Sequence, residues 1–260
     1  STNPPTITRE DRPMDIEVTN APVSNESGAL IFYTDGYYIA NAQDDTMPGG
    51  KRINPDNSVL QNRLYQGALA LPFPGHKNQY YLIHQMSTWA PDSFSFRKVY
   101  MCLYSKIDME KQNGLGEVTK ANWIFLKDTL CYGKLTACRH ANGRDWWLLI
   151  PKWNSAVYFK FLLTPYGLEP MGTQQLGNPP ITSVGQAVFS PDGTKYVKFN
   201  SLGSKGGWLD IYDFDRCSGL LSNYQTKFFD LAGAPGVGIS LNSRFLYLSN
   251  GSALYQYDLS

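Results

Sequence analysis

The sequence predicts an all-β protein, a β-propeller with about five blade-like units. Three observations lead to this fold class: an aromatic-rich composition, a turn-and-strand pattern that recurs along the chain, and the lack of a long helical stretch. Aromatic residues make up 14% of the 260 residues, and they favour the pleated, half-buried surface of a sheet. Repetition of one small supersecondary unit is the usual sequence signature of propeller blades.

The repeating unit is a tight turn followed by an aromatic or β-branched strand. Gly, Asn and Asp in the turns supply the positive φ that tight hairpins require. Successive copies are spaced by about 50 residues, except the second and third, which are nearer 67 residues apart. The five copies are Asn25–Tyr33, Pro74–Ile83, Ala141–Ile150, Ser190–Val197 and Ser240–Leu248.

Further strands flank each copy. A second strand follows each one, as Val99–Tyr104 and Trp208–Tyr212 do, and several alternate apolar with polar side chains. A strand also precedes four of the turns, as Ala68–Leu71 does. Three or four short strands per unit, in tandem, describe propeller blades, with a β-sandwich as the alternative. The expected units lie near residues 13–60, 65–130, 134–180, 184–232 and 236–260.

The two ends of the chain are expected to differ from the blades. Residues 1–12 have the composition of a linker or a disordered lead-in. The fifth unit stops after its third strand, which leaves two alternatives. An N-terminal strand at Asp15–Val18 completes it, or the chain is a fragment of a larger propeller. The segment Lys106–Lys120, in the longest interval, is expected to be an inserted loop and the first place for partner contact.

Charge and hydropathy exclude two classes of partner. The chain carries 23 Lys+Arg against 22 Asp+Glu, so it lacks the basic stripe that nucleic-acid binding requires. Its longest apolar stretch, Trp146–Pro151, is far too short to span a bilayer.

Four cysteines permit disulfides in an oxidising compartment. Cys131 and Cys138 are the candidate pair, because the short segment between them contains Gly133 and can fold back. Cys102 and Cys217 fall on different predicted units and are expected to stay unpaired. Buried thiols within strands are the alternative for all four.

No catalytic motif is visible. The chain has no GxSxG string and no CxxC pair, and its histidines, His76, His84 and His140, do not cluster, so we expect no catalytic residue, metal or cofactor. A propeller-fold hydrolase of the glycosidase kind would need paired carboxylates facing the channel. The candidates by position are Asp35, Asp145, Asp192 and Asp210, although the second and third fall in turns, where Asp commonly bonds its own backbone.

One group of residues suits carbohydrate or peptide binding. Aromatic and cationic side chains lie close together in the sequence, and such residues bind through stacking and charge-assisted hydrogen bonds. The candidate binding residues are Arg139, His140, Trp147, Lys152 and Trp153. In the structural alternative, the tryptophans pack between blades and Arg139 pairs with Asp145.

Several strings resemble a family of secreted β-propellers of Bacteroidota. They are Leu30–Gly36, Asp45–Pro48, Lys134–Trp147, Phe189–Lys195 and Leu254–Ser260. The resemblance implies a WD-repeat-like propeller, exported or at the cell surface and linked to type IX secretion or gliding motility. It also implies further blades, and it supplies no catalytic residue to carry over to this chain. We therefore expect a non-catalytic module that binds protein or glycan as a scaffold, with the hydrolase as the alternative.

Overall fold

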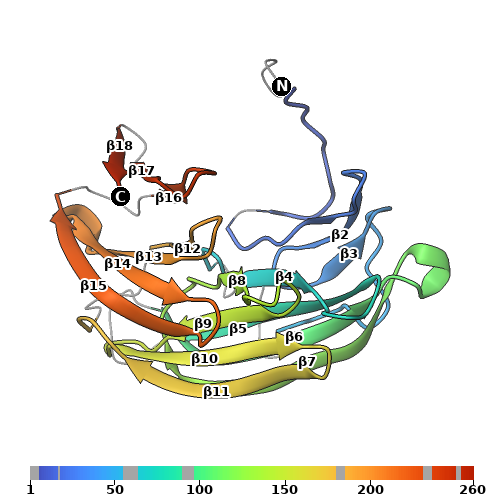
Figure 1. Cartoon of the computed structure of the whole chain (residues 1–260). Coiled ribbons are helices and arrows are strands. Elements are labelled where there is room, and N and C mark those ends of the chain that lie inside the picture. Colours follow the sequence, from blue (N-terminus) through green and yellow to red (C-terminus); the bar gives the residue numbers. More distant parts are fainter. Residues whose placement is uncertain are drawn as a thin grey trace.

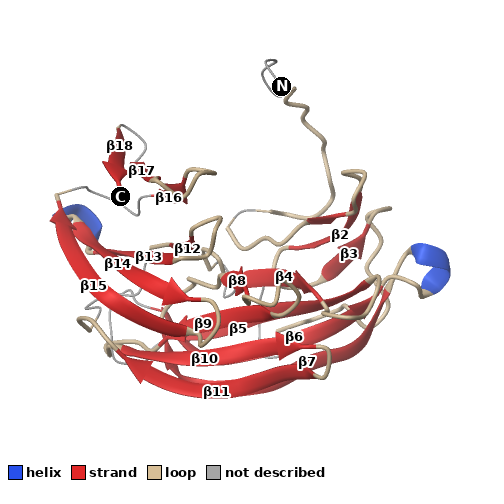
Figure 2. Ribbon diagram, in the orientation of Figure 1, coloured by secondary structure: helices blue, strands red, loops and turns tan. Residues whose placement is uncertain are grey.

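The structure is a computed structural model that describes residues 6–16, 18–54, 64–89, 97–179, 185–230, 236–249 and 253–260. It is a five-bladed β-propeller built from five antiparallel sheets, which confirms the predicted fold class (Figure 1). Within these residues the regular helix is limited to two short 3-10 turns, η2 (Gln112–Gly114) and η3 (Gly203–Lys205) (Figure 2). Residues 6–12 form neither helix nor strand.

Each sheet is one blade, and its strands pair with their neighbours in chain order. Blade 1 consists of β1 (Val23–Ser24), β2 (Leu30–Thr34) and β3 (Ile39–Asn41). Blade 2 consists of β4 (Ala68–Pro72), β5 (Gln79–Trp89), β6 (Arg97–Asp108) and β7 (Glu117–Leu130). Blade 3 consists of β8 (Ala137–Arg139), β9 (Trp146–Pro151), β10 (Val157–Thr164) and β11 (Gly167–Gln175). Blade 4 consists of β12 (Ala187–Phe189), β13 (Lys195–Ser201), β14 (Gly207–Asp215) and β15 (Leu220–Phe229). Blade 5 consists of β16 (Gly236–Ile239), β17 (Phe245–Ser249) and β18 (Leu254–Asp258).

Consecutive blades pack face to face through buried apolar side chains. Strand alternation makes this possible, because residues at even and odd positions point to opposite neighbours. Tyr212 of β14 packs toward blade 3 with Trp147, whereas Leu209 of the same strand packs toward blade 5 with Leu246. Similar clusters join blade 1 to blade 2 and blade 2 to blade 3.

The packing stops at the two outer blades. Among the described residues, no buried apolar cluster joins blade 5 to blade 1, and Figure 1 shows β16–β18 apart from β2 and β3. The N-terminal segment does not complete blade 5. Asp15, Ile16 and Val18 lie outside any strand, and Glu17 lies outside the described residues. Instead, Met14 packs on blade 1 against Tyr33, so this segment covers the other end of the propeller.

The segment Lys106–Lys120 is not an inserted loop, which corrects the sequence prediction. It is the end of a hairpin in which β6 and β7 continue to a short turn, and the longer spacing of this blade comes from its long strands. The base of the hairpin packs on blade 1, where the Val118 amide donates to the Pro48 carbonyl at 2.9 Å. Ile107 is buried in the same cluster. The exposed residues of the segment are 110–114 at the tip and Thr119 on β7.

Glutamine side chains join the blades to one another. The side-chain amide of Gln174, on β11, donates to Leu221 O and accepts from Leu221 N on β15. It thus makes the two hydrogen bonds that a neighbouring strand would make. Gln66, in front of β4, pairs in the same way with Ala187 on β12. Gln186 accepts from the Val237 amide and so connects blade 4 to blade 5.

Candidate functional site

The face of blade 4 that is turned toward blade 3 carries buried polar residues. Along β13, the alternate residues Lys198 and Asn200 point to this face, and along β14 Asp210 does so. All three are at most 3% exposed. Buried polar groups need partners within the protein, so these side chains form a defined network rather than a solvated surface.

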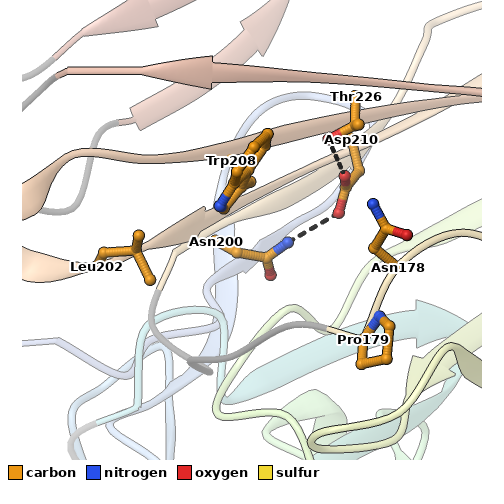
Figure 3. A pocket seen from close by; sticks show the side chains of 7 residues that line it. All are labelled: Asn178, Pro179, Asn200, Leu202, Trp208, Asp210 and Thr226. Carbon is orange, nitrogen blue, oxygen red and sulfur yellow. Dashed lines mark hydrogen bonds between the residues drawn. The ribbon is translucent and has the colours of Figure 1, made fainter.

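A pocket of about 240 Å³ lies at the end of this polar face. Its walls come from β13–β15 and from the segment after β11 in blade 3 (Figure 3). The lining residues are Asn178, Pro179, Asn200, Leu202, Trp208, Asp210 and Thr226. The pocket therefore forms only when blades 3 and 4 come together.

Asp210 is the hydrogen-bonding centre of the pocket. Its Oδ1 accepts from the Tyr224 hydroxyl at 3.0 Å and from Thr226 Oγ1 at 2.8 Å. Its Oδ2 accepts from Asn200 Nδ2 at 2.9 Å and lies 3.6 Å from Lys198 Nζ. Both carboxylate oxygens are thus held by donors from the protein.

Asn200 has one atom that the described residues leave without a partner. Its Oδ1 is buried and accepts no hydrogen bond within the described part of the chain. The amide orientation follows from the network, because the carboxylate of Asp210 can accept but not donate and so requires the Asn200 NH₂ group. The acceptor atom Oδ1 is therefore the one left for the pocket. A buried acceptor without a donor costs about 1–3 kcal/mol, so this atom favours a ligand that donates.

An aromatic pair borders the pocket. Trp208 on β14 is paired in register with Phe228 on β15, and their rings meet edge to face at 5.1 Å. Trp208 is 39% exposed and lines the pocket, and Phe228 is 42% exposed. Exposed indole rings beside a concave polar site offer an apolar face and suit ligands that have one apolar and one polar side.

Two lysines lie on the inner side of Asp210. Burial lowers the pKa of Lys134 to about 8, an effect that Cys131 opposes and Lys198 increases. Burial also lowers the pKa of Lys198, while Asp210 opposes this. Lys198 Nζ lies 4.9 Å from the centre of the Tyr158 ring, so its charge is partly stabilised by the aromatic face. These ammonium groups balance the charge of Asp210 from the core side.

The five predicted binding residues do not form one patch. Arg139 stacks on Trp146, with its guanidinium carbon 3.9 Å from the ring centre, and His140 lies nearby against the Cys217 carbonyl. Trp147 is 1% exposed and packs between blades 3 and 4, so its ring offers no surface for a ligand.

The other two predicted residues follow the opposite end of β9. Lys152 pairs with Asp128 at 2.8 Å, and the Trp153 amide donates to Thr129 O. The expected Arg139–Asp145 pair is also absent, because Asp145 is held by Arg144 at 2.7 Å. The two groups are close in sequence because only the six residues of β9 separate them, but they lie at opposite ends of that strand.

Of the four candidate carboxylates, Asp210 alone lines this pocket. Asp35 accepts from the amides of its own turn, at Tyr37 and Tyr38. Asp192 likewise accepts from Thr194 N at 3.0 Å within its turn. Asp145 is engaged by Arg144, so the structure does not bring a second member of this set to Asp210.

All four cysteines are free thiols, so the predicted Cys131–Cys138 bond is not formed. The two sulfurs face different neighbours: Cys131 Sγ lies 3.6 Å from Lys152 O, and Cys138 Sγ lies 3.9 Å from Gly193 O in blade 4. Cys138 begins blade 3, and its side chain belongs to the packing between blades.

The described ranges contain no group of three or more His, Cys, Asp or Glu side chains placed to hold a metal ion. In the same ranges, no helix has the length and apolarity needed to cross a membrane.

Neither a family model nor a curated protein matches the chain. Solved structures with a similar fold include a candidate 6-phosphogluconolactonase from Bacteroides uniformis, with 17% identity and a TM-score of 0.44 over 68% of this chain and 51% of the other. A second one, from Bacteroides fragilis, has 10% identity and a TM-score of 0.36, with 96% and 93% covered. A protein of unknown function from Desulfotomaculum acetoxidans has 13% identity and a TM-score of 0.43, with 74% and 68% covered. The chain thus spans about half the length of the Bacteroides uniformis protein.

Proposed function

We propose that this protein is a non-catalytic binding propeller whose blade-4 pocket takes a carbohydrate. The observation that carries the proposal is the buried, unpartnered Oδ1 of Asn200 in a pocket bordered by the exposed indole of Trp208. Sugars combine hydroxyl donors with apolar C–H faces. The acceptor would receive a hydroxyl, and the indole would stack on the C–H face.

The environment of Asp210 supports binding over hydrolysis. Glycosidases of the usual kind use two carboxylates, one as the acid and the other as the base or nucleophile. Asp210 is the one carboxylate among the lining residues, and both of its oxygens are occupied by donors from the protein. It therefore serves to orient Asn200 and Thr226. A propeller-fold hydrolase is the alternative.

The proposal includes a role in a cell-surface or exported assembly, as a scaffold that binds glycan or protein. The support is the resemblance of strings such as Leu30–Gly36 and Lys134–Trp147 to secreted propellers of Bacteroidota. A link to type IX secretion or gliding machinery belongs to the same proposal. Labelling intact cells of the source organism with a membrane-impermeant reagent tests it, since a protein that is labelled only after lysis is not at the surface.

Sugar binding is tested by calorimetric titration of the whole chain with a panel of mono- and oligosaccharides. We expect at least one of them to bind and W208A to weaken its affinity about two- to tenfold, because loss of an aromatic contact costs about 0.5–1.5 kcal/mol. The matched control is W123A, which removes a 53% exposed tryptophan on β7 outside the pocket. Equal affinities of W208A and wild type would place the sugar elsewhere, and no binding across the panel would refute the proposal.

The hydrolase alternative is tested with the same panel under turnover conditions. We expect the sugars to be recovered unchanged. Hydrolysis that is abolished by D210N, with the fold retained by circular dichroism, would establish the alternative and overturn the non-catalytic assignment.

A further inference from the structure

A second hollow lies at the opposite end of the blade-4 strands. This groove, of about 450 Å³, runs between blades 3 and 4 and is named the blade 3–4 groove below. Its walls include Arg139 and Trp146 from blade 3, the turn Ser190–Gly193 from blade 4, and Arg216 after β14. It shares no lining residue with the blade-4 pocket proposed to bind carbohydrate, so a site here is separate from that pocket.

Hydrogen-bond donors dominate this groove. Trp146 Nε1 is buried and has no acceptor within the described residues. The guanidinium carbon of Arg139 lies 3.9 Å from the centre of the same indole ring, and its Nη1 donates to Arg144 O at 2.9 Å. The stacking and the hydrogen bond hold the guanidinium in one orientation, so a ligand that binds it costs less side-chain conformational entropy.

The acceptors in the groove are largely occupied. Arg216 donates to the carbonyls of Arg139 at 2.8 Å and Asp192 at 3.1 Å, so these two backbone acceptors of the groove already have a donor. The Asp192 carboxylate uses its Oδ1 for Ser190 and Thr194 inside its own turn. The charges of two arginines against one aspartate, together with an indole N–H that has no acceptor within the described residues, give a site that is complementary to an anion with acceptor oxygens.

We propose that the blade 3–4 groove binds a carboxylate side chain of an acidic peptide segment. The two carboxylate oxygens match the edge of the Arg139 guanidinium and the Trp146 Nε1–H, which stand side by side as partners in the β8–β9 ladder. The apolar side chains of Val188 and Phe189 extend the groove beside them and suit the aliphatic part of a glutamate and its neighbours. The groove thus gives the propeller a peptide site at the other end of the blade-4 strands from the proposed carbohydrate pocket.

The test is a nuclear magnetic resonance titration of the whole chain, with the indole N–H signal of Trp146 assigned through its loss in W146F. The probe is acetylated, amidated tetraglutamate, and tetraglutamine is the uncharged control. We expect a saturable shift of the Trp146 signal with tetraglutamate alone. R139Q should weaken binding about tenfold or more, because hydrogen bonds to charged groups contribute about 1.5–3 kcal/mol. R52Q, which removes an exposed arginine on another blade, should leave the affinity unchanged.

W146F keeps the ring that supports Arg139 but removes the donor, so it should weaken binding while the fold is retained. Binding of tetraglutamate is followed there through the other indole signals and by calorimetry. No shift in the wild type, or equal affinity in R139Q and wild type, would overturn the proposal. An equal response to inorganic phosphate would show a general anion site and overturn the assignment to peptide carboxylate.

Discussion

Lys134 shows at the scale of a residue how this propeller places charge in its core. The side chain is fully buried, and burial lowers its pKa to about 8. The unfolded chain binds this proton up to about pH 10.5, so between these values the unfolded state holds more protons than the folded one. The contribution of Lys134 to the free energy of unfolding therefore rises with pH in that interval and is constant below pH 8.

The prediction compares wild type with K134M in urea unfolding at pH 7.0, 8.0, 9.0 and 9.5, buffer values chosen to span roughly the range of that titration. The difference in unfolding free energy should move in favour of the wild type by up to about 1.4 kcal/mol per pH unit above pH 8. Burial also raises the pKa of Cys131 and Tyr196, which lowers stability at high pH in both proteins. Lys134 lowers the pKa of Cys131, so the loss of Lys134 in K134M raises it further and shifts the difference in the same direction, toward the wild type. K77M, at an exposed turn, is the control. Parallel pH curves for wild type and K134M would contradict the prediction.

At the scale of elements, local patterns in the sequence located the repeating turns and strands. A turn such as Ser190–Gly193 is held by a hydrogen bond between its own first and last residues, so a short stretch of sequence is enough to predict it. The pocket was not predicted, because Asn178 and Pro179 approach it from a different blade. One signal was present: Lys198 and Asn200 alternate with Val197 and Phe199, which indicates a strand with polar groups on one buried face.

The β6–β7 hairpin gives a prediction at this scale. Residues 111–114 form an exposed tip in which Gln112 and Asn113 have φ of 52° and 55°. Replacing these four residues by Asn-Gly should change the unfolding free energy by less than about 1 kcal/mol, because loop shortening is inexpensive and Asn-Gly readily adopts the positive φ that a tight hairpin turn requires. I107A at the hairpin base should cost about 2–5 kcal/mol through the cavity it leaves against blade 1. Urea unfolding measures both, and a larger loss from the tip replacement would show that the tip makes contacts in solution.

At the scale of the whole molecule, the buried apolar clusters of the described residues join blade 5 to one other blade, and blades 2, 3 and 4 to two others each. The sequence could not show this, since each blade carries the same local pattern whether or not a neighbour covers it. The strand β18 is mostly exposed, with Leu254 at 69%. Elements with few buried contacts open at lower free energy than the core.

Amide hydrogen exchange tests this difference between blades. We expect the amides of β18 to exchange fastest among strands and those of β9 and β13 slowest, since blades 3 and 4 are packed on both faces. Strand β2 of blade 1, where Met14 covers Tyr33, serves as the comparison for an outer blade that has a cover. Equal protection of β18 and β13 would mean that blade 5 has a second partner in solution.

The pairing of Gln66 with Ala187 also bears on the order of folding. These residues are 121 positions apart, yet they share two hydrogen bonds, so the contact closes a loop that contains blades 2 and 3. Contacts of such high sequence separation form late, after the local hairpins have reduced the entropy of the intervening chain. Interactions absent from the transition state act mainly on the rate of unfolding. We therefore expect Gln66, in front of β4, to slow the unfolding of the assembled blades and to have little influence on how fast they fold.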